Sequence, residues 1–243
     1  DKLTIPLLRD FTYFLGPVPA DYHPNTLRIY YLQFVWYHEL YKQGRDELLF
    51  HDRKPRNTRK NFLIYSQANC VPFRQTAYDE LSKLGNVHHG GRCNGRIESE
   101  NKTKVETGVT LSNWVDNIKH YSDYRFCLVM EHDASEGYVT EKILMAFQAG
   151  CVPIYYGVRS IFDLFNEKAF VFYDIHNETA ALEQIAKLES NSSLYDEMMD
   201  EPILAHGQET IEDYFSFNDE IGAGKLKQRI RTMLGIDKID FVK

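Results

Sequence analysis

Apolar and polar positions along the chain form blocks that predict strands and helices in alternation. Short apolar runs are typical of buried strands, and longer segments with apolar residues three or four positions apart are typical of amphipathic helices. The predicted strands are 62–67, a short strand within 86–96, 124–131, 151–156 and 169–174. The predicted helices are 73–85, 111–121, 140–149 and 179–190, with further helical segments to the end. This succession predicts a parallel sheet with helices on both faces.

The residues before the first of these strands follow a different pattern. The segment 27–41 is apolar and rich in aromatic residues, and we expect it to form a buried helix. The segment 45–61 is charged and contains a proline, which makes it the best candidate for a linker. We therefore divide the chain into a small N-terminal portion with its linker, 1–58, and an α/β domain with C-terminal helices, 59–243.

Two predicted helices carry further signals. Gly85 follows a helical segment and is expected to occupy the C′ position, where glycine commonly ends a helix. In the last helix, 224–235, the residues Leu226, Ile230 and Leu234 share one apolar face, and the basic face is expected to be solvated.

Composition places the chain among globular proteins and excludes some partners. Of the 243 residues, 43% are hydrophobic and 26% charged, which allows a full core without disulfide or metal staples. The net charge of -7 argues against a nucleic-acid partner, because that affinity depends on lysine and arginine at the phosphates. No apolar run approaches the ~20 residues of a membrane helix, and no signal peptide is visible. We expect a soluble, cytoplasmic protein with no membrane span in this chain.

Cysteine and histidine show no metal-binding pattern. The four cysteines form no C-x-x-C pair, and Cys127 and Cys151 lie in apolar runs, where we expect small buried hydrophobic residues. This usage demands no oxidising compartment. His88 and His89 are adjacent, so in a strand they point to opposite faces and do not form one metal site. Because a D-x-D pair is also absent, no metal is predicted.

Two cations lie at helix starts, where the helix dipole disfavours positive charge. Lys142 falls in the first turn of 140–149, and Arg74 falls in the first turn of 73–85. Each is compatible with a local arrangement, such as a pair between Lys142 and Glu141 or a stem that covers apolar surface. Each is also compatible with an anion, because free amides and a cation at a helix start suit a phosphate. Both helices follow strands of one parallel sheet, so we favour a diphosphate held at its carboxyl edge.

The strongest family resemblance lies in 137–157, GYVTEKILMAFQAGCVPIYYG, which resembles the signature of the α-1,3-fucosyltransferase family. VMEHD (129–133) is similar to the F-E-N segment of that family, and NCVPFRQTAYDEL (69–81) is similar to its R-x-x-x-Y-x-x-L helix. The resemblance implies an α/β fold of the GT-B type, in which two Rossmann-like domains face a cleft. Residues 59–243 would be the Rossmann-like parallel-sheet domain that binds a nucleotide sugar, and 1–58 a reduced N-terminal acceptor domain.

The resemblance also implies roles for individual residues. Arg74 and Lys142 would bind the diphosphate. Tyr138 and Glu141 would contact the phosphate and ribose, and Glu131 would lie near the donor sugar as a catalytic residue. The full set of implied nucleotide-sugar-binding residues is Arg74, His132, Tyr138, Thr140, Glu141, Lys142 and Gly157. The implied reaction is inverting and metal-independent: a carboxylate deprotonates an acceptor hydroxyl, and fixed cations stabilise the departing nucleotide.

Departures from the family pattern leave alternatives open. His132 and Met130 stand where the F-E-N segment has asparagine and phenylalanine. GDP-fucose is the expected donor, and a relative that uses another donor such as UDP-xylose is the alternative. The catalytic base of the family falls near Asp1, which we take as the base, with His23 and Glu39 as possible substitutes. The small N-terminal portion also leaves open a non-catalytic module that binds nucleotide sugars.

The implied partners are a nucleotide-sugar donor and, as acceptor, an oligosaccharide or a glycoprotein glycan. The nucleotide sugar is a co-substrate, so no separate cofactor is implied. We favour an enzyme over a binding module, because Glu141 and Lys142 lie together at a ligand edge. A Golgi anchor that preceded Asp1 and was removed remains an open alternative to the cytoplasmic location.

Overall fold

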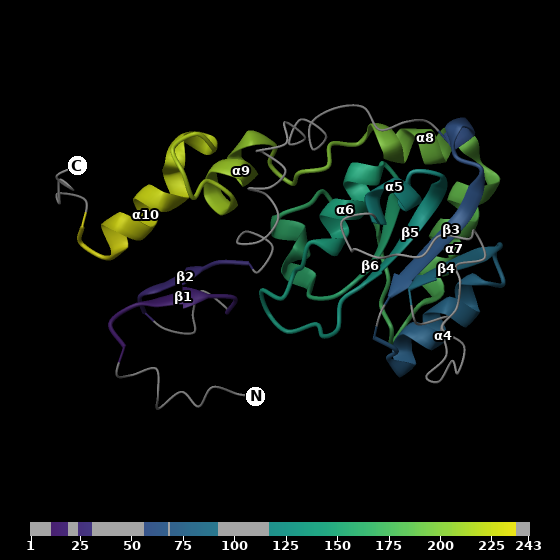
Figure 1. Cartoon of the computed structure of the whole chain (residues 1–243), viewed down its shortest axis with the longest axis horizontal. Coiled ribbons are helices and arrows are strands. Elements are labelled where there is room, and N and C mark those ends of the chain that lie inside the picture. Colours follow the sequence, from purple (N-terminus) through teal and green to yellow (C-terminus); the bar gives the residue numbers. More distant parts are fainter. Residues whose placement is uncertain (1–10, 19–23, 31–55, 68, 92–116, 237–243) are drawn as a thin grey trace.

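A five-stranded, fully parallel sheet forms the centre of the protein (Figure 1). The computed structural model describes residues 11–18, 24–30, 56–67, 69–91 and 117–236. In spatial order the strands are β4 (Val87–Gly91), β3 (Asn61–Gln67), β5 (Tyr124–Met130), β6 (Val152–Tyr156) and β7 (Val171–Phe172). The predicted strands and their parallel arrangement are confirmed, although β7 is shorter than expected.

Helices cover both faces of the sheet and divide the core into two layers. One layer contains side chains of α4 (Pro72–Leu81), α7 (Thr179–Ser190) and α8 (Ser192–Asp200). The other contains side chains of α5 (Asn117–Tyr121) and α6 (Lys142–Ala149). The strand residues between them are buried on both sides, which explains their nearly continuous apolar sequences. The prediction of helices on both faces is therefore confirmed.

The strand order creates a topological switch point between β3 and β5. Numbered in chain order, the strands of the sheet are arranged 2-1-3-4-5, the doubly wound order found in flavodoxin-like folds. The helix after β3 packs on one face, and the helix after β5 packs on the other. Ligands of such sheets bind where the carboxyl ends of these two strands diverge. The segments that follow β3 and β5 are therefore the first place to look for a site.

The start of the segment expected to form a buried helix is instead a strand. β1 (Phe14–Gly16) and β2 (Thr26–Arg28) form a two-stranded parallel ribbon, with Leu15 opposite Leu27. Tyr30, just after β2, is fully buried. Aromatic and β-branched residues suit a pleated surface, so pairing with β1 overrides the helical pattern here. The remaining residues of that prediction, 31–41, lie outside the described residues.

Helix boundaries differ from the predictions at two places. α4 begins with Pro72 at its first position and ends at Leu81, four residues before Gly85. Gly85 is therefore not the C′ residue; a Cβ there would come within 2.6 Å of the Phe62 ring. α6 begins at Lys142, two residues later than predicted, and ends against Gly150, whose φ of 72° is left-handed.

The C-terminal helices extend beyond the sheet on the side where β1 and β2 also lie (Figure 1). They are α9 (Gln208–Tyr214) and α10 (Lys225–Met233), and the short 3-10 segments are η2 (Arg56–Thr58), η4 (Arg159–Asp163) and η5 (Gly222–Gly224). The ring of Tyr214 contacts that of Tyr30 at 5.6 Å between centroids. Only the first residue of the predicted apolar face is buried: Leu226 is fully buried, whereas Leu234 is 40% exposed. No helix in the described ranges is long and apolar enough to cross a membrane.

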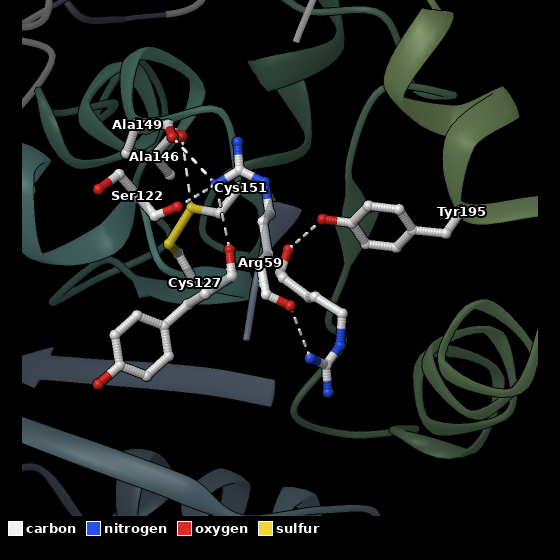
Figure 2. The surroundings of a disulfide bond; sticks show 9 residues. Arg59, Ser122, Cys127, Ala146, Ala149, Cys151 and Tyr195 are labelled. Carbon is white, nitrogen blue, oxygen red and sulfur yellow. Dashed lines mark hydrogen bonds between the residues drawn. A yellow bond between two sulfur atoms is a disulfide. The ribbon is translucent and has the colours of Figure 1, made fainter. Parts of the chain in front are cut away.

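Cys127 and Cys151 are buried, as predicted, but they form a disulfide bond instead of serving only as small hydrophobic residues (Figure 2). Cys127 lies within β5, and Cys151 directly precedes the neighbouring strand β6. Adjacent parallel strands bring their α-carbons to 6.0 Å, within the range that a disulfide requires. Cys70 is also disulfide-bonded. Disulfides persist mainly in oxidising compartments. The cysteines therefore do bear on the compartment, contrary to the expectation from the sequence.

Candidate functional site

A buried carboxylate organises the loop between β5 and α6, residues 131–141. Glu131 follows β5 directly and is fully buried. Its Oε1 accepts a hydrogen bond from the backbone N–H of Thr140 at 2.8 Å, and the Thr140 hydroxyl lies 2.8 Å from both carboxylate oxygens. Lys142 Nζ completes the group at 3.2 Å from Oε2. Each of these contacts ties the start of α6 to the end of β5.

The cation at the start of α6 is compensated by Glu131. Sequence reasoning had considered Glu141, whose Oε1 lies farther from Lys142 Nζ, at 3.9 Å. Lys142 Nζ also donates to Thr140 Oγ1 at 2.8 Å. An ammonium has three N–H donors, and the Lys142 side chain is 29% exposed. One donor therefore stays available to a ligand after the bonds to the described residues are made.

Arg74 occupies the corresponding position after β3, in the first turn of α4. Its guanidinium is buried and donates from Nη1 to the carbonyl of Asn69 at 3.0 Å and from Nη2 to that of Met130 at 2.8 Å. Burial lowers the pKa of Arg74, and the nearby Tyr65, Glu131 and Tyr138 oppose that shift. Its Nε has no hydrogen-bond partner among the described residues. A buried, unpartnered N–H is costly, so this is a place where an acceptor fits.

The two cations therefore meet at the switch point from opposite faces of the sheet. Arg74 binds the carbonyl of Met130, and Lys142 binds the carboxylate of the next residue, Glu131. α4 and α6, which carry the cations, belong to different core layers. Glu131 offsets part of this positive charge, so the arrangement favours an anion over the carboxyl end of β5 through the N–H donors of both side chains rather than through a large net charge.

The other predicted site residues divide into those near this group and those outside the described residues. Tyr138 is half-buried in the loop, Glu141 is the N-cap residue of α6, and His132 is exposed just after Glu131. Gly157 is buried, and a Cβ there would overlap the Tyr155 hydroxyl, so packing alone requires glycine. Burial raises the pKa of Tyr155 well above its usual value. The candidate bases Asp1, His23 and Glu39 lie outside the described residues.

Sequence reasoning missed the contact between the N-terminal ribbon and the β5–α6 loop. Arg28 of β2 binds Asp163 at 3.1 Å and comes within 3.9 Å of Glu136 in the loop. Gly137 has a left-handed φ of 71° and packs against the backbone of Pro17. The glycine before the Tyr-x-Thr-Glu-Lys sequence could have suggested a tight backbone approach, but nothing in the sequence identifies its partner.

Replacing Gly137 with alanine should disturb both this contact and the site. The new Cβ would meet the Pro17 backbone, with the carbonyl carbon 2.7 Å away, and would also strain a positive φ. We expect a loss of about 2–4 kcal/mol in unfolding free energy, and weaker nucleotide binding because Tyr138 and Thr140 follow directly. Chemical denaturation and calorimetric titration measure the two effects.

Gly207→Ala is the matched control for that variant. Gly207 also has a positive φ, 53°, but its Cβ would meet nothing within 4 Å. The control should lose about 1–3 kcal/mol from backbone strain alone and keep its nucleotide affinity. Equal losses in both variants would show that the ribbon contact is irrelevant to the site.

In the described part of the chain, no group of three or more His, Cys, Asp and Glu side chains is placed to hold a metal ion. The described residues of the site supply two cations, a half-buried tyrosine and carboxylates. Such a set binds and stabilises an anion, and its geometry is fixed by buried hydrogen bonds rather than by a flexible surface.

Comparison with known proteins identifies the family. Residues 54–200, more than half of the chain, match the family model described as glycosyltransferase family 10 (fucosyltransferase), C-terminal part. The chain is a member of glycosyltransferase family 10. The matched range contains the sheet, both cations and the whole β5–α6 loop, so the family resemblance of the sequence is confirmed.

Several curated proteins resemble this family 10 chain. A protein of Acanthamoeba polyphaga mimivirus, described as a candidate fucosyltransferase, is 28% identical over 92% of this chain and 37% of its own length. The alpha-(1,3)-fucosyltransferase FucT of Helicobacter pylori is 30% identical over 70% of this chain and 32% of its own length. GDP-fucose protein O-fucosyltransferase 3 of Xenopus laevis is 30% identical over 55% of this chain and 29% of its own length. The chain thus spans about a third of the length of these relatives.

Solved structures of α1,3-fucosyltransferase share the fold of the family 10 chain. A complex with GDP superimposes with a TM-score of 0.58 at 21% identity, over 94% of this chain and 71% of the other. A complex with GDP-fucose gives a TM-score of 0.57 at 23% identity over the same shares. The predicted α/β fold of the GT-B type is confirmed.

Proposed function

We propose that the chain is the donor-binding part of an inverting, metal-independent fucosyltransferase that transfers fucose from GDP-fucose to a hydroxyl of a glycan. The observation that carries the proposal is the convergence of Arg74 and Lys142 on consecutive residues at the carboxyl end of β5. Family membership and the α1,3-fucosyltransferase complexes with GDP and GDP-fucose support it.

The two cations fit a diphosphate leaving group. An acceptor hydroxyl oxygen attacks the anomeric carbon while the bond from that carbon to the diphosphate oxygen breaks. The hydroxyl proton passes to a base, for which Asp1 stays our prediction. GDP departs with an added negative charge, and cations held by buried contacts stabilise that charge without having to reorganise.

The remaining residues are assigned to the rest of the donor. Glu141 is half-buried at the start of α6, where its carboxylate suits vicinal ribose hydroxyls. Tyr138 is assigned to the phosphate region, and the exposed His132 to the base or sugar. Thr140 and Glu131 are buried together, so we assign them to holding Lys142 in place.

GDP-fucose is preferred over UDP-xylose as donor because relatives named for GDP-fucose match 55% of this chain, and a solved structure with the same fold is a complex with GDP-fucose. Two classes of acceptor can be distinguished by experiment. Relatives include alpha-(1,3)-fucosyltransferases, and also enzymes named as protein O-fucosyltransferases. We propose a glycan hydroxyl as the first acceptor to test and a protein hydroxyl as the second.

A thermal-shift panel of nucleotides tests the donor. A ligand at about 100 times its dissociation constant adds about 2.7 kcal/mol to stability, which for a chain of this size raises Tm by roughly 5–10 °C. We expect this shift with GDP and GDP-fucose, in the presence of EDTA, and little with UDP or UDP-xylose. A larger shift with UDP-xylose would replace the proposed donor, and a shift abolished by EDTA would contradict metal independence.

Release of GDP from GDP-fucose in the presence of an acceptor separates the enzyme from a non-catalytic module. The enzyme should release GDP with a fucosylated product, and a binding module should bind GDP without turnover. Offering a glycan and a peptide acceptor side by side then assigns the acceptor class.

A further inference from the structure

A buried cation lies at the C-terminal end of α6, the end opposite Lys142 (Figure 2). Arg59 is only 4% exposed, and its Nη1 donates to the carbonyls of Ser122 at 2.7 Å, Ala149 at 3.2 Å and Tyr124 at 3.4 Å. These carbonyls belong to the turn after α5, the end of α6 and the start of β5. One guanidinium therefore joins three elements of the core.

Among the described residues, the side-chain hydrogen bonds of Arg59 go to backbone carbonyls. Burial lowers the pKa of its guanidinium, and the nearby Tyr195 and Asp123 oppose that shift. The C-terminal end of a helix carries partial negative charge, which compensates a cation there. Gly150 allows the approach, because a Cβ at this residue would overlap Arg59 Nη2.

The Cys127–Cys151 disulfide fixes the same end of α6 by a covalent bond. Cys151 follows Gly150, the C-cap residue of α6, and its Sγ lies 3.4 Å from the carbonyl of Ala146 in the last turn (Figure 2). The bond to Cys127 attaches this end to the middle of β5. The loop that the disulfide closes contains Glu131, Thr140 and Lys142.

Fixing the C-terminal end of α6 also fixes its N-terminal end, where Lys142 lies. Residues 143–149 of the helix are all buried, so the helix has little freedom to move within the core. Its eight residues span about 12 Å. A shift or rotation at the Gly150 end would therefore move Lys142 away from Glu131.

We propose that Arg59 and the Cys127–Cys151 disulfide form a clamp that positions the start of α6, and thereby Lys142, for nucleotide-sugar binding. Arg59 and the two cysteines are positioning residues that do not touch the ligand. The inference rests on the proposed function and deepens it, because it names what holds the donor site in its binding geometry.

Three variants test the clamp: Arg59→Ala, Arg59→Lys and the double variant Cys127→Ala/Cys151→Ala. Peptide mapping without reduction first verifies the disulfide in the wild type. Removing the disulfide should lower Tm by about 5–10 °C. By analogy with the outer-shell partners of metal ligands, whose loss typically costs 10- to 100-fold, we expect GDP affinity to fall about tenfold in Arg59→Ala and in the double variant. Arg59→Lys keeps the charge at the helix end and should recover part of the affinity.

Amide hydrogen exchange provides a readout that needs no nucleotide. Exchange in residues 131–142 should become faster in the variants by a larger factor than exchange in β3, which reports the loss of global stability. Ser216→Ala is the matched control, because it removes hydrogen bonds that a fully buried hydroxyl makes to Glu212 and Leu226 in the C-terminal helices, away from Arg59 and the disulfide. The control should lose stability and keep both GDP affinity and loop protection.

The outcomes separate the clamp from the proposed function. If the wild type binds GDP and the variants bind it equally well at a temperature where all are folded, the clamp is overturned and the donor assignment stands. If loop exchange is unchanged in the variants, the clamp is also overturned. If the wild type binds no GDP, the proposed function is wrong. The clamp would then have no donor site to position, and the inference would be overturned as well.

Discussion

Lys142→Ala should lower fucose transfer by about 10²- to 10³-fold, the usual cost of removing one fixed group that stabilises developing charge. After its bonds to Glu131 and Thr140, the Lys142 ammonium has one N–H left among the described residues, and we assign that donor to the proposed diphosphate. The loss should appear both in kcat/KM with GDP-fucose and in the affinity for GDP. Steady-state kinetics and calorimetric titration measure the two quantities.

Two further variants test whether the loss of transfer is specific to the position and the side chain of Lys142. Lys168→Ala removes an exposed lysine away from the β5–α6 loop and should change neither quantity. Lys142→Arg keeps the charge but has a different shape, so it should recover only part of the transfer. Unchanged transfer in Lys142→Ala would remove the central support for the donor site.

The sequence predicted the sheet well because its strands are buried on both faces. Such strands are continuous apolar runs, and the alternation with helices dictates parallel pairing. The rule that ligands bind at the carboxyl ends of parallel strands favours Arg74 and Lys142 as site residues, which stays a prediction. The confirmed family resemblance rests on the same segments, and the role of each site residue stays a prediction.

The predictions from the sequence that were wrong share a physical cause. Each of these features depends on a contact with a residue that is distant in the sequence. β2 looks helical by composition and becomes a strand only because β1 is beside it. Gly85 looks like the end of a helix. Glycine is instead required there because a Cβ would overlap the ring of Phe62 on β3. Cys127 and Cys151 are separated by 24 residues and meet only because β5 and β6 are adjacent. No local pattern contains these contacts.

The partner of Lys142 is the most informative of these differences. Local reasoning weighed Glu141, its sequence neighbour, and an anionic ligand. The structure adds Glu131, eleven residues earlier, whose carboxylate is buried and whose hydrogen bonds reach both Thr140 and Lys142. A fully buried carboxylate that is bonded on both oxygens is suited to holding other groups in place. Its assignment as a catalytic residue at the donor sugar therefore needs a direct test.

Glu131→Gln is the variant that distinguishes the two roles. An amide cannot accept from Thr140 and Lys142 on both of its heavy atoms, so one buried donor loses its partner. We expect a loss of roughly 2–4 kcal/mol in unfolding free energy, below the 3–5 kcal/mol of a fully buried ion pair because Lys142 is partly exposed. GDP affinity should fall as well, because Lys142 is then no longer fixed.

Glu189→Gln provides the comparison at the opposite edge of the sheet. Glu189 accepts two hydrogen bonds from Arg125, at 2.8 Å and 2.5 Å, near the start of β5. This variant should lose stability yet bind GDP like the wild type. If Glu131→Gln instead kept its stability and its GDP affinity and lost only kcat, Glu131 would act on the reacting sugar and not on Lys142. Loss of all three in Glu131→Gln, and of stability alone in Glu189→Gln, is the result that a positioning carboxylate requires.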